Sequence, residues 1–118
     1  MVVYKRAQTA AMKLFELSKE FPKDERYSLT DQVRRSSRSV VVNFAEAWRK
    51  RRYEAAFVSK LSDSETEAVE TQEWIIFAVK CNYLKRAEAE QLFNEYEAMI
   101  KTLVGMIDNA EKWTIKPK

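Results

Sequence analysis

Apolar residues recur every three or four positions along almost the whole chain. The clearest run closes the sequence, and its members are Ala89, Leu92, Tyr96, Met99, Leu103, Met106, Ala110 and Trp113. This spacing places all eight side chains on one face of an α-helix. Three similar runs come before it. A chain with four such stripes can bury them together by packing helix against helix.

Glycine and proline, which sheet proteins need for their many turns, are nearly missing. The 118 residues contain one glycine and two prolines, so we expect long helices and few connections. The predicted helices cover about residues 3–19, from Ser28 to within Arg49–Arg52, 53–80 and 86–112. Together they predict an all-α fold, an up-down-up-down antiparallel four-helix bundle, with residues 1–118 as a single domain.

Local signals predict the ends of these helices. Phe21-Pro22 ends the first helix, because a residue before proline is pushed out of the helical region. Ser28, with Asp31 three residues later, predicts an approximate capping box at the start of the second. Asn82 tolerates left-handed backbone, so it is expected to end the third.

The end of the third predicted helix is unusual because it is apolar on every side. Its sequence over residues 74–79 is WIIFAV. A helix in a four-helix bundle is covered on only about half of its surface, whereas this segment needs cover all round. We therefore expect Trp74, Ile76 and Phe77 to contact another copy of the chain.

A polar flank runs along the second predicted helix beside its apolar stripe. Ser39, Asn43 and Glu46 share this flank, and small polar residues there allow hydrogen bonding to a neighbouring helix. Arg35 lies beside them and is expected to be partly buried against an acidic neighbour. The predicted structural polar network comprises Arg35, Ser39, Asn43, Glu46, Glu67 and Glu70.

Charge is distributed unevenly between the two halves of the chain. Residues 1–60 hold 14 Lys and Arg against seven Asp and Glu, a net charge of +7, whereas residues 61–118 carry −4. Such a split gives either a bipolar surface or two halves that pair with each other. In a bundle the halves lie side by side, so net charge alone argues only weakly for a polyanionic partner.

The densest positive charge is the best candidate for a binding feature. The predicted nucleic-acid-binding residues are Arg34, Arg38, Arg49, Lys50, Arg51 and Arg52. Lys and Arg neutralise phosphates and release counterions, which gives affinity without sequence preference. Trp48 and Tyr53 flank the cluster and could stack on bases. Alternatively, both aromatics belong to the core, and the cations complement the helix dipole or pair with carboxylates of the third helix.

Three segments carry a family resemblance. They are FPKDERYSLTDQVRRSSRSVVVNFAEAWRKRRY, ETQEWIIFAVKCNYL and MIDNAEKW, which cover most of the chain in order. The chain resembles the four-helix-bundle proteins first noticed in intervening sequences of 23S rRNA genes, to which the accessory protein of diversity-generating retroelements is related. The resemblance implies a ring-like homopentamer and a basic surface suspected of contacting RNA or DNA; it implies no reaction. Ala47 and Asn82 stand where many members have glycine.

The residue inventory argues against most enzyme classes. There is no histidine for a nucleophilic triad or a di-iron site, and Gly105 alone cannot form a phosphate-binding loop. Cys81, near a helix end, is expected to be a buried small apolar residue and not a reactive thiol. The remaining enzymatic alternative is a Mg²⁺-dependent nucleotide hydrolase that uses the helical carboxylates Asp63, Glu67, Glu70 and Glu73. The favoured prediction is a non-enzyme without metal or cofactor.

A second alternative is a protein–protein adaptor or scaffold that presents its surface to a partner enzyme such as a reverse transcriptase. Salt dependence separates the two binding hypotheses, because phosphate binding weakens steeply with added salt and an apolar interface does not. The sequence has neither a long apolar run nor a signal-peptide pattern. We therefore expect a cytoplasmic protein that does not enter the membrane.

Overall fold

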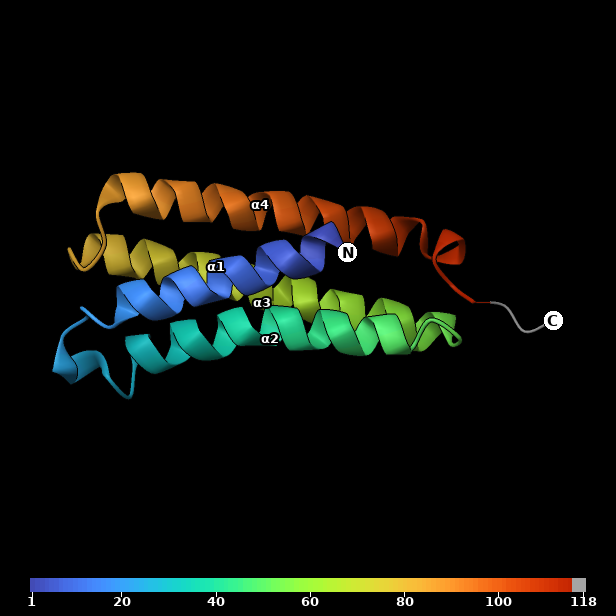
Figure 1. Cartoon of the computed structure of the whole chain (residues 1–118), viewed down its shortest axis with the longest axis horizontal. Coiled ribbons are helices and arrows are strands. Elements are labelled where there is room, and N and C mark those ends of the chain that lie inside the picture. Colours follow the sequence, from blue (N-terminus) through green and yellow to red (C-terminus); the bar gives the residue numbers. More distant parts are fainter. Residues whose placement is uncertain (116–118) are drawn as a thin grey trace.

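The computed structural model describes residues 1–115 and contains four long helices (Figure 1). The helices are α1 (Val2–Ser18), α2 (Leu29–Arg49), α3 (Glu54–Lys80) and α4 (Arg86–Asp108). There are also two short 3-10 turns, η1 (Lys23–Glu25) and η2 (Ala110–Lys112). Consecutive helices run in opposite directions, so the predicted all-α antiparallel bundle is confirmed. Residues 116–118 of the predicted domain lie outside the described residues.

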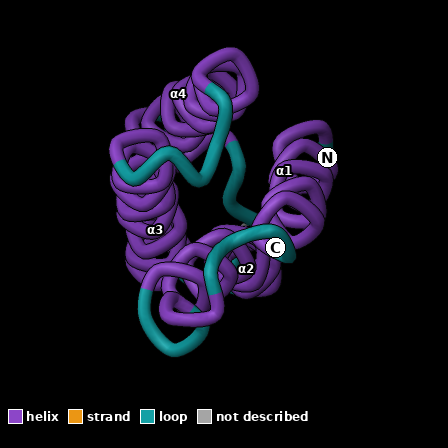
Figure 2. Tube along the Cα trace, turned by 90° about the vertical axis from the view of Figure 1, so that its left-hand side faces the viewer, coloured by secondary structure: helices purple, strands orange, loops and turns teal. Residues whose placement is uncertain are grey.

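The helices follow one another around the bundle axis in chain order. Figure 2 shows α1 and α2 along one side of the bundle and α3 and α4 along the other. At 17 residues, α1 is the shortest helix, and α3 is the longest at 27. The turn between α2 and α3 lies at the same end of the bundle as η2 (Figure 1). This end, which carries Arg49–Arg52, is called the basic end below.

The predicted apolar stripes form the core. All four helices contribute buried apolar side chains to this core. Completely buried are Leu14 of α1, Phe57 and Leu61 of α3, and Tyr96 and Leu103 of α4; α2 contributes Val33 and Val40. Full burial of a large apolar side chain stabilises a fold by about 1.5–3 kcal/mol. Trp113, the last member of the closing stripe, is partly buried against this core.

Small polar side chains lie inside the contact between α2 and α3. Thr71 Oγ1 donates a hydrogen bond to Ser36 Oγ over 2.8 Å, and Ser64 Oγ donates to the carbonyl oxygen of Val40 over 2.7 Å. Ser36, Ser64 and Thr71 are fully buried, and these bonds satisfy their hydroxyl groups. These buried hydroxyl bonds add to the hydrogen bonding that was expected from the flank with Ser39, where Asn43 accepts a hydrogen bond from Lys60 of α3.

The predicted capping box at the start of α2 is wrong. The Ser28 side chain does not cap the helix; its Oγ donates to Glu25 Oε1 over 2.6 Å, and the same carboxylate oxygen accepts the Leu29 backbone N–H at 3.3 Å. Glu25 Oε2 also accepts the Tyr83 hydroxyl at 2.9 Å. A carboxylate from the preceding turn therefore replaces the expected serine cap, and it ties that turn to the one between α3 and α4.

The other predicted helix ends agree more closely with the structure. Asn82 is left-handed with φ 63°, and the backbone N–H groups of Asn82 and Tyr83 donate to the carbonyls of Val79 and Ala78. This is the Schellman pattern expected at that position. Cys81, just before it, is exposed, so the prediction of a buried cysteine is wrong. By contrast, α4 ends at Asp108 and not near Lys112, because η2 forms a separate turn. No helix within residues 1–115 is both long and apolar enough to cross a membrane.

Candidate nucleic-acid and subunit interfaces

Three cations are free at the basic end. Arg49 closes α2, and Lys50 and Arg52 lie in the turn that follows; all three side chains are exposed. None of them forms an ion pair with another residue in the range 1–115. Cations at the C-terminus of a helix interact favourably with its dipole, which accounts for part of their presence. Their charge is nevertheless available to a ligand in solvent.

Arg51, in the middle of this run, is half-buried and is held against its own chain. Its guanidinium carbon lies 3.9 Å from the centre of the Trp48 ring, and its Nε donates to the Trp48 carbonyl oxygen over 2.9 Å. Trp113 meets the same indole edge-on at a centroid distance of 6.1 Å. Trp48 is therefore enclosed by its own chain, as the core alternative predicted, whereas Tyr53 is exposed.

Arg34 and Arg38 belong to a different surface. Both guanidinium groups lie over the Phe15 ring of α1, at 4.7 and 5.6 Å, and Arg34 Nε also donates to Ser18 Oγ over 2.8 Å. The 11 residues from Arg38 to Arg49 correspond to about 16 Å along the helix. The structure therefore does not bring the six predicted nucleic-acid-binding residues together in one patch.

The predicted polar network consists of two separate ion-pair clusters between α2 and α3. Arg35 Nη1 lies 3.1 Å from Glu67 Oε2, and Arg35 Nη2 also binds Glu70, whose Oε2 accepts the Trp74 indole N–H at 3.1 Å. The hydrogen bond to Glu67 raises the pKa of the Arg35 guanidinium.

The second cluster is built around Lys60, a residue that the sequence analysis did not single out. Its Nζ lies 2.9 Å from Glu46 Oε2 and 3.5 Å from Asn43 Oδ1, while Asn43 itself donates to the Ser39 carbonyl. The hydrogen bond to Glu46 raises the pKa of Lys60. The α3 partner was missed because a single lysine on a long helix has no distinguishing pattern.

Three of the four carboxylates of the magnesium alternative, all but Glu73, are engaged with cations. Glu67 and Glu70 bind Arg35, and Asp63 Oδ2 lies 3.9 Å from Lys60 Nζ. Among residues 1–115 there is no group of three or more acidic, cysteine or histidine side chains placed to hold a metal ion. The arrangement favours the alternative that these carboxylates are structural partners of α2.

The apolar end of α3 is only partly covered. Phe77 is 53% exposed and Ile76 36% exposed, and Val69 two turns earlier is 45% exposed. Trp74 is half-buried, packs against Phe77 at a ring distance of 5.9 Å and donates its N–H to Glu70. We call Val69, Ile76 and Phe77 the α3 patch. Residues 1–115 leave these three side chains partly exposed, so the described part of the chain does not supply the full cover that an apolar segment requires.

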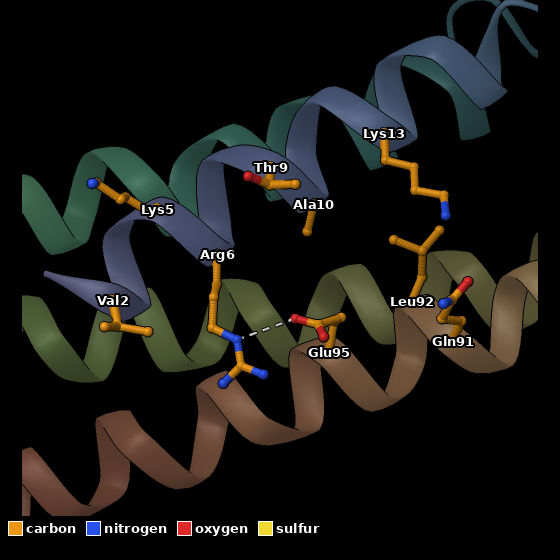
Figure 3. A pocket seen from close by; sticks show the side chains of 9 residues that line it. All are labelled: Val2, Lys5, Arg6, Thr9, Ala10, Lys13, Gln91, Leu92 and Glu95. Carbon is orange, nitrogen blue, oxygen red and sulfur yellow. Dashed lines mark ion pairs between the residues drawn. The ribbon is translucent and has the colours of Figure 1, made fainter.

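A further groove separates α1 from α4 (Figure 3). It has a volume of about 470 Å³, and Arg6 crosses it to form an ion pair with Glu95 at 3.4 Å. Lys5 and Lys13 also line it, whereas Ala10 and Leu92 supply apolar surface. The sequence gives no signal for this groove, because its residues come from the two ends of the chain and form no local pattern.

Fold and surface together define a class: an antiparallel four-helix bundle with a basic end and an uncovered apolar patch. The family model of the 23S rRNA-intervening sequence proteins matches the sequence over residues 1–105, and the chain belongs to this family. A crystal structure of a protein of unknown function from the S23 ribosomal protein family of Bacteroides thetaiotaomicron is similar, with a TM-score of 0.81 and 26% identity. The match covers 91% of this chain and 96% of that one. No curated protein matches the chain.

Proposed function

We propose that the protein is a non-enzymatic homo-oligomer, pentameric as the family resemblance implies, that binds nucleic acid without sequence preference through its basic end. The observation that carries the proposal is the set of three neighbouring exposed cations, Arg49, Lys50 and Arg52, without carboxylate partners among residues 1–115. Phosphate contacts by such side chains release counterions and supply affinity that is independent of base sequence.

The geometry of the basic end suits a backbone contact better than base recognition. Trp48, the aromatic ring next to the cluster, is already covered by Arg51 and Trp113, so it cannot stack on a base without rearrangement. Three cations in one subunit bind weakly, but an assembly repeats them in every subunit, and linked weak contacts gain affinity through effective concentration. Oligomerisation and binding therefore support each other in this proposal.

The test is a fluorescence-anisotropy titration of the protein with structured RNA and with duplex DNA at two salt concentrations. The variant Arg49→Ser, Lys50→Ser, Arg52→Ser removes three charges from the basic end. The control Lys23→Ser, Arg26→Ser, Lys85→Ser removes three exposed charges near the opposite end of the bundle (Figure 1). Both variants have the same net charge, so a general loss of attraction to polyanions affects them equally.

The expected result is salt-sensitive binding that the first variant loses and the control retains. Equal binding by both variants would refute the assignment to the basic end. No binding at low salt by the folded wild-type protein would refute nucleic-acid binding itself. In that case the adaptor alternative, a scaffold for a partner enzyme such as a reverse transcriptase, becomes the hypothesis to pursue.

A further inference from the structure

We infer that copies of this chain associate head to tail: the groove between α1 and α2 of one copy receives the α3 patch of the next. The inference rests on the proposed homo-oligomer and deepens it, because it names the two surfaces that meet. The residues that line the α1–α2 groove are Gln8, Thr9, Ala11, Met12, Arg38, Val41 and Val42.

The α1–α2 groove is a large and mostly apolar depression. Its volume is about 680 Å³, and its two most exposed apolar side chains are Met12 at 59% and Val42 at 54%. Met12 comes from α1 and Val42 from α2, so the packing of these two helices creates the groove. Methionine adapts its shape to a partner surface, which makes it common at binding sites.

The α3 patch lies on the other side of the bundle. Figure 2 shows the pair of helices α1 and α2 opposite the pair α3 and α4. Ile76 faces the boundary with α4, where it lines a separate depression with Val79 and Phe93. The chain thus has two exposed apolar surfaces on different helix pairs. One copy cannot bring its own groove and patch together, but two copies can.

Charge decides between head-to-tail association and a symmetric contact of like faces. The helices α1 and α2 together carry seven basic and three acidic side chains, whereas α3 and α4 carry four basic and eleven acidic ones. Two grooves or two patches facing each other would juxtapose charge of the same sign. A groove facing a patch places net positive charge against net negative charge, which favours the head-to-tail arrangement.

Two individual residues illustrate the complementarity. Arg38 lines the groove one helical turn from Val41 and Val42, and Glu73 lies one turn from Ile76 and Phe77. Both charged side chains are exposed, and neither forms an ion pair within the described part of the chain. In the head-to-tail contact, each charge can meet one of opposite sign at the rim of an apolar centre.

A head-to-tail contact has a consequence that a symmetric one lacks. Every copy uses two different surfaces, so each added copy leaves one groove and one patch open until the assembly closes into a ring. Destroying either surface alone should stop assembly. Mixing a groove variant with a patch variant should restore a single contact, because each supplies the surface that the other has lost.

The experiment uses two full-length variants, a groove variant Met12→Glu, Val42→Glu and a patch variant Ile76→Glu, Phe77→Glu. The four positions are solvent-exposed on helices and glutamate is a good helix former, so both variants should fold. Circular dichroism checks this. The control Tyr27→Glu, Val104→Glu adds the same charge at exposed apolar positions outside both surfaces. Native mass spectrometry and sedimentation velocity measure the assembly state.

We expect an oligomer for the wild type and the control, monomers for each variant alone, and a 1:1 heterodimer with twice the mass of one chain when the variants are mixed. A groove variant that assembles like the wild type, or a mixture that stays monomeric, would overturn the inference while leaving the homo-oligomer intact. A monomeric wild type would instead overturn the homo-oligomer itself, and the nucleic-acid titration would remain a separate test.

Discussion

The guanidinium of Arg35 on α2 holds the carboxylate of Glu67 on α3, with Nη1 and Oε2 separated by 3.1 Å. Glu70, one turn further along α3, binds the same guanidinium and accepts the indole N–H of Trp74. The cluster therefore links the two helices that share the largest contact in the bundle to the aromatic side chain behind the α3 patch. A guanidinium suits this place because its planar fork can serve two acceptors at once.

Replacing Arg35 by glutamine should destabilise the fold by about 1 kcal/mol, the upper part of the range for partly exposed ion pairs. The Glu67 side chain is only 19% exposed, so losing its cation leaves a poorly solvated carboxylate. Urea denaturation measures the free energy of unfolding. The control Arg86→Gln removes an exposed arginine that has no ion pair among the described residues, and it should change stability by less than about 0.5 kcal/mol. Equal effects of the two substitutions would contradict the structural role of Arg35.

Stability should depend on the ionisation of Glu25. Hydrogen bonds from Ser28, from Tyr83 and from the Leu29 backbone lower the pKa of this carboxyl below its ordinary value of 4.5. A lowered pKa means that the folded state favours the carboxylate, so the stabilisation is present above pH 4.5 and disappears as the pH falls through the lowered pKa. The difference in melting temperature between wild type and Glu25→Gln should therefore be largest near neutral pH and shrink toward pH 3.

Tyr83 provides the matched test of the same contact from the alkaline side. Its hydroxyl donates to Glu25, which raises the pKa of Tyr83 to about 12. The stabilisation by the protonated hydroxyl is present below the ordinary pKa of 10 and is lost as the pH rises through 12. Tyr83→Phe should remove this dependence. A melting temperature of Glu25→Gln that differs from wild type by the same amount at every pH would rule out the linkage.

Removing the Tyr96 hydroxyl should leave the fold equally stable or make it slightly more stable. The side chain is fully buried, its hydroxyl oxygen has no hydrogen-bond partner among the described residues, and burial raises the pKa of the phenol. An unsatisfied buried hydroxyl carries a desolvation penalty of about 1–3 kcal/mol, which Tyr96→Phe relieves. Tyr96→Leu, which removes the ring, should destabilise by about 2 kcal/mol or more. A loss above about 1 kcal/mol for Tyr96→Phe would show that the hydroxyl has a partner.

The fold could be predicted closely because its signals are local. The stripes at three- and four-residue spacing identify the core, Pro22 ends the first helix, and Asn82 supplies the left-handed cap that ends the third. The start of α2 could not be predicted in the same way. Two acceptors compete for its free N–H groups, and the Glu25 carboxylate binds where the Ser28 hydroxyl was expected because η1 carries it back to the helix end.

The candidate site was predictable only in part, because sequence proximity is a poor guide to surface proximity. Arg51 lies between the exposed cations Lys50 and Arg52, yet its side chain turns back over Trp48. Arg34 and Arg38 lie on α2, the helix that ends at this cluster, but both pack over Phe15 of α1 and so belong to a surface away from the basic end. The α1–α2 groove was not identified at all, since Met12 and Val42 become neighbours only when the two helices pack.

The division of the basic residues between two surfaces predicts that a substitution within α2 and one in the turn after it will differ in their effect on nucleic-acid binding. Arg52→Gln should make the negative slope of log K against log salt for duplex DNA shallower, by about 0.9 for each subunit that contacts the duplex, because one phosphate contact is lost. Arg34→Gln removes the same charge from a side chain that lies over Phe15 and binds Ser18, so its slope should equal that of the wild type. Titrations at four salt concentrations measure both slopes on proteins whose assembly state has been checked by sedimentation. Equal reductions for the two variants would show that the whole of α2 faces the nucleic acid, and the boundary drawn between the basic end and the α1–α2 groove would then be wrong.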